Sequence, residues 1–286
     1  MPDGALQRIL VAVDLTLRGH RALRRGMQLA LASGADLRLI YVCSEDFPEQ
    51  LKLAQEKIAR EELAAHAARA REQGLAKVST AILEGRTYEE IVSVAIDYAA
   101  DLIVLGPHRP SSFAQDLLGT TAGKILRAGQ CPVLVAREED GGRYDSVMVA
   151  VDFSPASRRA LRVALEWFST AHIAVLSAYG KVRHKAEPRT DLAGETRRLA
   201  VQGLLSEVAT EMGPLGVVAS AAEPLAVYGW PEDAIDDFIA TRKPSLVVMG
   251  TNGQTGSPRA IFGSVTEWVM GSASCDVLLI PTHLST

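Results

Sequence analysis

The sequence predicts an α/β protein with two tandem domains, each a doubly wound, mostly parallel five-stranded sheet with flanking helices. Short apolar runs of strand length alternate along the chain with longer helical segments, and this alternation is typical of parallel strands joined by right-handed crossovers. The order of these segments in the first half recurs in the second half. A chain of 286 residues is also long enough for two domains that each bury a core.

The first half opens with an apolar run, 9–13, which ends at Asp14 and has the nearly continuous apolar character of a strand buried on both faces. Thr16 is expected to cap the helix that follows, and Gly34 is expected to end it. Further strands are predicted at 37–42, 78–83, 102–105 and 132–136, and further helices at 49–73, 88–98 and 120–128.

The second half repeats this order, with a first strand at 147–151 that ends at Asp152. Ser154 is expected to cap the next helix, and Pro155 suits its first position, where no backbone N–H is needed. Further strands are predicted at 173–178, 217–222, 246–249 and 275–279, and a long helix at 192–212.

The repeat also sets the domain boundaries. Gly85 and Gly229 are separated by the same interval as Gly106 and Gly250. Between the halves lies an acidic, glycine-rich segment without strand or helix periodicity, which has the character of a linker. We therefore place the first domain at 1–138 and the second at 143–286.

Composition excludes several classes of protein. The net charge is −4 and no long basic block offsets it, which argues against a nucleic-acid-binding function. No apolar stretch reaches the ~18 residues that a membrane-spanning helix needs, so we expect no membrane insertion. The three cysteines have no close spacing, so they suggest neither a disulfide framework nor a metal site. The expected location is the cytoplasm.

The strongest candidate site is a glycine-paced loop in the second half. Gly250 and Gly253 follow the apolar run 246–249, and Gly263 and Ser264 stand where the next helix begins. Glycines let the backbone approach an anion, and the N–H groups of a helix N-terminus face negative charge. If the first and fourth strands are neighbours, Asp152 lies across the crevice, placed to accept from ribose hydroxyls or to help hold Mg²⁺. The alternative is that the glycines only permit a tight turn.

This combined pattern resembles the universal stress protein family. The motif Gly-x2-Gly-x9-Gly-Ser at 250–264, the segment 151–155 and the closing run 275–278 carry the resemblance, which covers nearly the whole chain as two tandem domains. It implies a flavodoxin-like, adenine nucleotide α-hydrolase-like fold and ATP as the ligand, accompanied by Mg²⁺. It also implies that the last strands, 133–136 and 277–280, pair within the chain or in a homodimer.

The resemblance assigns roles to residues of the second domain. Asp152 would contact the ribose or the metal, and Ala178, at the end of the second strand, would give backbone contacts to adenine. The residues implied to wrap the ribose and the phosphates are Gly250, Gly253, Gly263, Ser264 and Val265.

The first domain departs from this pattern, because Arg109 occupies the position that corresponds to Gly253. An arginine lacks the conformational freedom of glycine, and its side chain enters the space that the ribose would use, so we expect a degenerate site. The alternative is that Arg109 and His108 supply a cation that holds a phosphate or another anion. The residues of this weaker site are Asp14, Val42, Gly106, Arg109, Gly119 and Thr120.

We expect a tandem universal-stress-type protein that binds ATP in its C-terminal domain and has a regulatory or stress-survival role. No positioned base or nucleophile stands beside the loop, so we expect no catalytic residues and at most slow ATP hydrolysis. We expect no metal site from protein side chains alone, with Mg²⁺ reaching Asp152 only through the nucleotide. The alternative is a protein-interaction module of the same fold that binds no nucleotide. The sequence leaves ATP, AMP and a cyclic nucleotide open as ligands, and it names no protein partner.

Overall fold

The computed structural model divides the chain into two compact units, and we describe each by itself. The first unit is residues 1–143 with 283–286, and the second is residues 144–282. The structure describes residues 6–107, 120–128, 131–139, 142–179, 190–213, 222–253 and 262–282.

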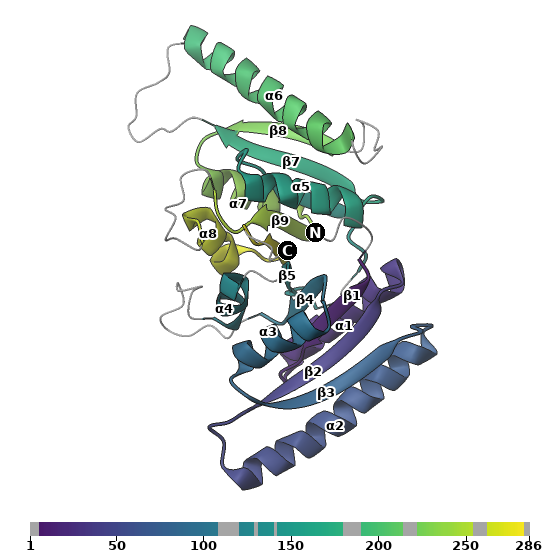
Figure 1. Cartoon of the computed structure of the whole chain (residues 1–286). Helices are drawn as coiled ribbons and strands as arrows, with labels where there is room; N and C mark the ends of the chain where they lie inside the picture. The colour runs from purple at the N-terminus through teal and green to yellow at the C-terminus, as the bar shows by residue number, and fades with distance from the viewer. Residues whose placement is uncertain are drawn as a thin grey trace. The chain divides into compact units, whose positions relative to one another are not determined.

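The first unit is a parallel sheet with strand order β3-β2-β1-β4-β5 (Figure 1). Because crossovers between parallel strands are right-handed, α1 and α2 cover one face of this sheet and α3 and α4 cover the other. Its strands are β1 (Arg8–Ala12), β2 (Asp36–Ser44), β3 (Val78–Gly85), β4 (Leu102–Leu105) and β5 (Val133–Val135). Its helices are α1 (Leu17–Ser33), α2 (Glu49–Glu72), α3 (Thr87–Asp97) and α4 (Thr121–Ala128).

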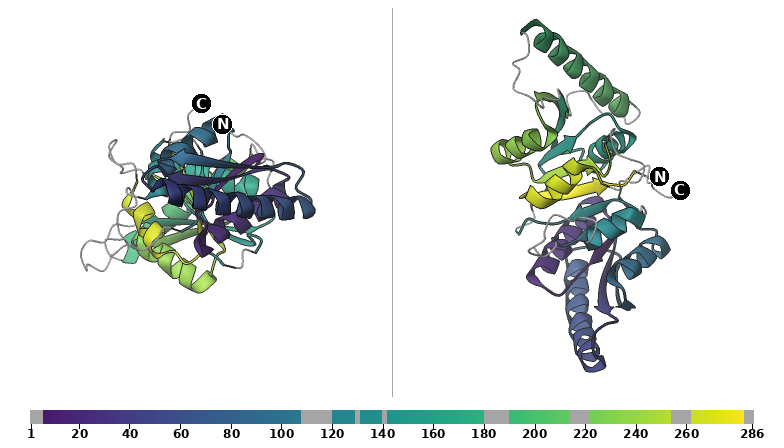
Figure 2. Two further views of the ribbon diagram at one scale, coloured as in Figure 1. Left: turned by 90° about the horizontal axis from the view of Figure 1, so that it is seen from below. Right: turned by 90° about the vertical axis from the view of Figure 1, so that its left-hand side faces the viewer.

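The second unit repeats the same architecture, with strand order β10-β9-β6-β7-β8. Its helices and strands, coloured from teal to yellow, are seen from two further sides in Figure 2. Here α5 packs beside α6, and α7 packs beside α8. Its strands are β6 (Ser146–Ala150), β7 (His172–Tyr179), β8 (Ala222–Tyr228), β9 (Leu246–Gly250) and β10 (Asp276–Ile280). Its helices are α5 (Pro155–Trp167), α6 (Thr190–Met212), α7 (Pro231–Arg242) and α8 (Ser264–Ser272).

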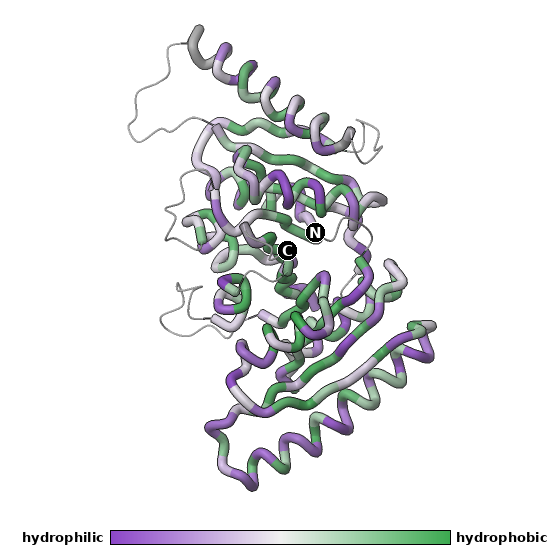
Figure 3. Tube along the Cα trace, in the orientation of Figure 1, coloured by the Kyte–Doolittle hydropathy of each residue, from purple (hydrophilic) through white to green (hydrophobic). Residues whose placement is uncertain are grey.

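The predicted fold class is confirmed in both units. The first and fourth strands of each unit are parallel neighbours, β1 with β4 and β6 with β9, which is the order that a crevice at the sheet edge requires. The apolar runs form the centres of the sheets, and residues 9–11 and 147–149 are fully buried. Figure 3 shows this apolar character along the strands, whereas α2 alternates between hydrophobic and hydrophilic residues along its length. No helix in the described part of the chain is long and apolar enough to cross a membrane.

One predicted strand was wrong. The sequence placed the third strand of the second unit at 217–222, but β8 runs from Ala222 to Tyr228, and residues 214–221 lie outside the described part of the chain. Pro224 lies within β8 and disguised it, because a proline argues against a strand in the middle of a sheet. β8 is the edge strand next to β7 in its unit, and proline is tolerated in an edge strand. Moving β3 along the sequence by the interval between Gly85 and Gly229 gives the correct position of β8.

Candidate functional site

The candidate residues of the second unit meet at one edge of its sheet. Ala150 lies opposite Met249 in the β6–β9 pair, so Asp152 and the loop after Gly250 leave the sheet side by side. The N–H of Val151 donates to the carbonyl of Leu176 at 2.9 Å, which continues the register and puts Ala178 level with Asp152. The structure therefore gathers these predicted residues at the point where the strand order reverses, the usual place for a ligand in this architecture.

The loop between β9 and α8 is closed by hydrogen bonds at its base. The N–H of Gly263 donates to the carbonyl of Thr251 at 2.9 Å. The hydroxyl of Thr266 donates to the carbonyls of Gly250 and Thr251, at 3.2 Å each. These bonds join the end of β9 to the first turn of α8, while residues 254–261 of the loop lie outside the described part of the chain. The sequence analysis missed Thr266, because a threonine inside a helix carries no signal of this bond.

Replacing Thr266 by valine is expected to lower the free energy of unfolding of the second unit by about 1–2 kcal/mol, because the isosteric side chain cannot donate to the two carbonyls. All three tryptophans, Trp167, Trp230 and Trp268, lie in this unit, so denaturant unfolding followed by tryptophan fluorescence reports on it alone. Thr241→Val is the matched control, because the Thr241 hydroxyl bonds only within α7. Equal losses in both variants would rule out a special role for Thr266.

Gly250 and Gly253 are glycines because a Cβ has no room at these positions, and not because their backbone conformation excludes other residues. Neither Gly250 nor Gly253 has a positive φ, so neither is needed for a left-handed backbone conformation. A Cβ on Gly253 would lie 2.5 Å from Oδ2 of Asp152, so the glycine lets the loop lie against that carboxylate. A Cβ on Gly250 would lie 2.7 Å from the Cβ of Ala156 and 2.8 Å from its carbonyl carbon. Gly250 thus allows α5 to pack on β9, and only Gly253 opens space at the crevice.

The N-terminus of α8 is left without a side-chain cap. Gly263 is its N-cap residue, with φ −77° and ψ 156°, and no described side chain accepts a hydrogen bond from its first turn. The first N–H groups of a helix have no partner within the helix, so those of Ser264 and Val265 face outward from its end. By contrast, the N–H of Ser157 in α5 donates to the hydroxyl of Ser154 at 3.2 Å. Of these two helix ends at the crevice, that of α8 is the one whose first N–H groups are left open to an anion.

The Ser264 hydroxyl already has a partner that the sequence analysis missed. It donates to Oε1 of Glu232, in the first turn of α7, at 3.4 Å. An acidic residue in the first turn of a helix is ordinary, since it complements the helix dipole, so nothing in the sequence pointed to this contact. Glu232 places a negative charge beside the groups expected to receive a phosphate.

A strained turn sets the direction of the aspartate in both units. Phe153 has φ 65° and Leu15 has φ 55°, a left-handed conformation that costs a residue with a Cβ roughly 1–2 kcal/mol. The turn lets Oδ1 of Asp152 accept the N–H of Ser154 at 3.1 Å, and Oδ1 of Asp14 accept the N–H of Thr16 at 3.1 Å. Strain retained at the same position of both repeats is typical of a site rather than of a connecting loop.

The first unit brings its candidates to the equivalent edge but arranges them differently. Gly106 follows β4, and Val42 lies level with Asp14 because Ala12 pairs with Ile40. The Thr16 hydroxyl donates to Oδ1 of Asp14 at 2.7 Å, and this oxygen faces Gly19 of α1. Arg109 and Gly119 lie outside the described part of the chain.

The N-terminus of α4 in the first unit is capped by its own chain. The N–H of Gly123 donates to the hydroxyl of Thr120 at 3.0 Å, and the N–H of Lys124 donates to the carbonyl of the same threonine at 3.0 Å. Thr120 is the counterpart of Ser264, so the helix starts one residue later than α8. Its first turn has fewer open N–H groups for an anion.

Fold and site together define a class: tandem doubly wound α/β domains with an aspartate at the switch point of each sheet and, in the second unit, a glycine loop beside it. A universal stress protein of Mycobacterium tuberculosis is 23% identical over 302 residues, which cover 95% of this chain and 96% of that protein. One of Methanocaldococcus jannaschii is 30% identical over 142 residues, 48% of this chain and 82% of that protein. A crystal structure of a universal stress protein from Archaeoglobus fulgidus shares the fold, with a TM-score of 0.71 at 20% identity, over 96% of this chain and 98% of that one. The family model for the universal stress protein family matches residues 5–137 and 143–281, and the chain belongs to this family.

Proposed function

We propose that the chain binds one adenine nucleotide, ATP with Mg²⁺, in the crevice of its second unit, and acts as a regulatory or stress-survival protein. The observation that carries the proposal is the meeting of three features at one sheet edge. These are the carboxylate of Asp152, the loop that Gly253 holds against it, and the uncapped first turn of α8. Carboxylates suit ribose hydroxyls and Mg²⁺, and open backbone N–H groups suit phosphates.

The elements around the crevice support a location for the proposed ligand. Ala178 lies level with Asp152 on β7, on the side away from β9, so a base there and a ribose at Asp152 would lead the phosphates toward α8. The backbone N–H groups of Ser264 and Val265 are the proposed phosphate donors, with the Ser264 hydroxyl joining only after it leaves Glu232.

Native mass spectrometry of the protein as purified, followed by calorimetry with Mg²⁺-ATP, tests the proposal. The expected result is one adenine nucleotide per full-length chain, with AMP and a cyclic nucleotide as competing ligands in the same titration. A chain that carries no nucleotide and shows no heat of binding with any of the three contradicts the proposal.

Glu232→Gln is expected to raise the affinity for Mg²⁺-ATP by about two- to fivefold, because it removes a negative charge beside the phosphate donors and weakens the contact that holds Ser264. Asp233→Asn removes a charge from the same first turn of α7 without a described contact to Ser264, and it serves as the control. The comparison is made by calorimetry at one salt concentration. An unchanged affinity in Glu232→Gln would show that the phosphates bind away from Ser264.

We further propose that the protein is not a dedicated enzyme. The polar side chains described at the crevice are a carboxylate fixed by a backbone N–H, the Ser154 cap and the Ser264 hydroxyl. Among these, only the Ser264 hydroxyl meets a carboxylate, that of Glu232, and at 3.4 Å on an exposed surface this contact does not activate the hydroxyl as a nucleophile. Hydrolysis of bound ATP would therefore depend on positioning and Mg²⁺ alone and would be slow. Pairing of the last strands, 133–136 and 277–280, stays a prediction.

A protein-interaction module is the second candidate function, and the surface of the long helices favours it. Leu53 and Ile58 of α2 are 60% and 50% exposed, and Leu199 of α6 is 59% exposed. Contiguous exposed apolar patches mark surfaces that bind a partner, and these side chains are the candidates for such a patch on the long helices. The mass-spectrometric experiment separates the two candidates, because the module binds its partner without any nucleotide.

A further inference from the structure

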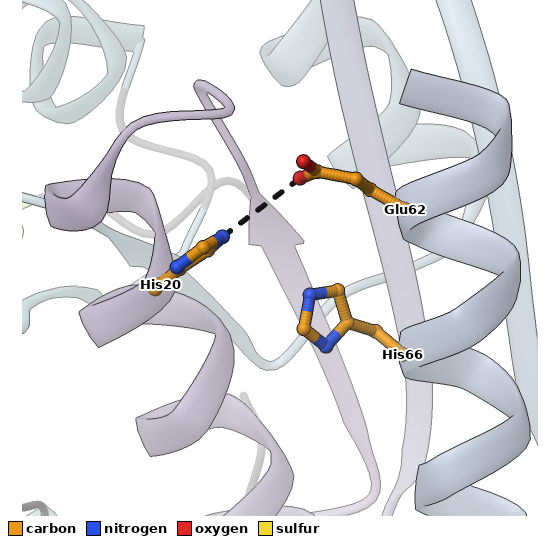
Figure 4. Close-up of side chains that lie close together, drawn as sticks. All are labelled: His20, Glu62 and His66. Carbon is orange, nitrogen blue, oxygen red and sulfur yellow. Dashed lines mark ion pairs between the residues drawn. The ribbon is translucent and has the colours of Figure 1, made fainter. Parts of the chain in front are cut away.

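Three polar side chains of the first unit converge between α1 and α2. His20 lies on α1, and Glu62 and His66 lie one turn apart on α2 (Figure 4). Each offers one ligand atom, and these atoms all lie within 4.8 Å of one another. Nε2 of His20 is 3.8 Å from Oε2 of Glu62.

The atoms at the centre of this cluster lack hydrogen bonds. Nε2 of His20, Oε2 of Glu62 and Nδ1 of His66 are each shielded from solvent and have no hydrogen-bond partner among the described residues. A buried polar atom without a partner costs about 1–3 kcal/mol, so three of them at one point are an unfavourable arrangement unless something binds there. Two imidazoles and a carboxylate are all ligands for a metal cation.

The second unit shows how the same place is filled when no cation is needed. Arg158 follows His20 by the interval that separates Asp14 from Asp152, and it lies on α5, the counterpart of α1. It forms an ion pair with Glu207 of α6 at 2.6 Å, and one turn further along both helices Arg162 pairs with Glu211 at 2.9 Å. Arginines supply the positive charge between these helices in the second unit. In the first unit His20 takes the place of Arg158, so Glu62 has its ion pair with an imidazole instead of a permanently charged arginine.

We propose that His20, Glu62 and His66 form a binding site for a divalent transition-metal ion, Zn²⁺ above all. Zn²⁺ binds imidazole nitrogen and carboxylate oxygen at about 2.0–2.2 Å in tetrahedral geometry, which places ligand atoms about 3.3 Å apart. The observed separations require small rotations of the three side chains to reach this value. Three protein ligands leave a fourth position for water. Mg²⁺ prefers sites made of oxygen atoms, so the ion that accompanies ATP does not compete.

Access and protonation are compatible with this site. The side chains of His20 and Glu62 are each 39% exposed at their outer edges, which gives an ion and a water molecule a path from solvent. Burial, with smaller contributions from His20 and Arg69 and an opposing one from Glu62, lowers the pKa of His66. A bound ion would join the first turn of α1 to the middle of α2. The proposal is independent of nucleotide binding.

Titration of the full-length, chelator-treated protein with Co²⁺ and then Zn²⁺, without nucleotide, tests the site. The expected result is the visible absorption of one Co²⁺ per chain in a low-symmetry nitrogen and oxygen environment, displaced by one equivalent of Zn²⁺. His66→Ala and the nearly isosteric Glu62→Gln should each weaken Zn²⁺ binding by at least about 100-fold, more than the loss of a second-shell partner does. Circular dichroism of each variant confirms that it is folded.

His172→Ala is the matched control. His172 also lies near a glutamate, Glu223, at 3.5 Å, but the described residues offer no third ligand beside this pair. The His172→Ala variant should bind Co²⁺ and Zn²⁺ as the unmodified chain does. Absence of Co²⁺ absorption at one equivalent would leave His20 and Glu62 as a simple ion pair and overturn the proposal. An unchanged spectrum in folded His66→Ala, or an equal loss in His172→Ala, would overturn it as well.

Discussion

Replacing Asp152 by alanine is expected to weaken Mg²⁺-ATP binding about 10- to 100-fold, which corresponds to the loss of a charge-assisted contact of about 1.5–3 kcal/mol. Its carboxylate lies against Gly253 and is fixed by the N–H of Ser154, so it is already directed at the crevice before a ligand arrives. The equivalent Asp14→Ala should change the affinity by less than about twofold, because Thr16 engages Asp14 twice and the helix beyond the loop is self-capped. Calorimetry on the full chain measures both.

A second substitution tests the same crevice from the other side. A Cβ on Gly263 would lie 3.7 Å from the backbone nitrogen of Gly253, so the branched side chain of Gly263→Val would enter the space between loop and helix. We expect it to abolish nucleotide binding while the unit stays folded. Equal losses from Asp152→Ala and Asp14→Ala would contradict the asymmetric model. Full affinity in Gly263→Val would contradict the position of the phosphates.

Gly250→Ala is expected to have the largest effect on stability, lowering the free energy of unfolding of the second unit by about 1–3 kcal/mol. The added methyl group would meet the backbone of Ala156 and Ser157, at 2.8 and 3.0 Å, and neither can move unless α5 shifts away from β9. Unfolding in denaturant, followed by the fluorescence of the three tryptophans of this unit, gives the measurement.

Two other glycines provide the controls for Gly250. Gly253→Ala would meet only the end of the Asp152 side chain, which can turn aside by giving up its bond to the Ser154 N–H, so we expect a smaller loss of stability than for Gly250→Ala but weaker nucleotide binding. Gly271→Ala, in the last turn of α8, would meet no described atom within 4 Å and should be neutral or slightly stabilising. If Gly250→Ala proves as mild as Gly271→Ala, the close contact between α5 and β9 is not a constraint.

The elements and the crevice were predictable because they depend on local patterns and on a repeat. Fully buried parallel strands read as apolar runs, so 9–13 and 147–151 were located within one residue of β1 and β6. Asp152 and the loop glycines were found because chain order alone brings the ends of the first and fourth strands together. Each of these signals is contained in the sequence within a few residues.

What was missed depends on contacts across the fold. The contact of Glu232 with Ser264 joins two helices, and the need for a glycine at 250 comes from a helix that precedes it by almost a hundred residues. The grouping of His20 with Glu62 and His66 exists only because α1 and α2 cover the same face of one sheet. Contacts between side chains of different helices or strands have no fixed spacing in the sequence, so a search for motifs does not detect them.

Helix α4 begins after Thr120 and helix α8 begins after Gly263. Because of this difference, the stability of the two units should respond differently to dissolved anions. The first turn of α4 is satisfied by its own hydroxyl at any concentration of solute. If a nucleotide binds as proposed, the first turn of α8, which has no side-chain cap among the described residues, gains partners for its N–H groups. The stability of the second unit should then rise with the logarithm of free nucleotide concentration while that of the first stays constant. One polypeptide would then contain one unit whose stability reports the nucleotide concentration and a second unit whose stability does not change with it.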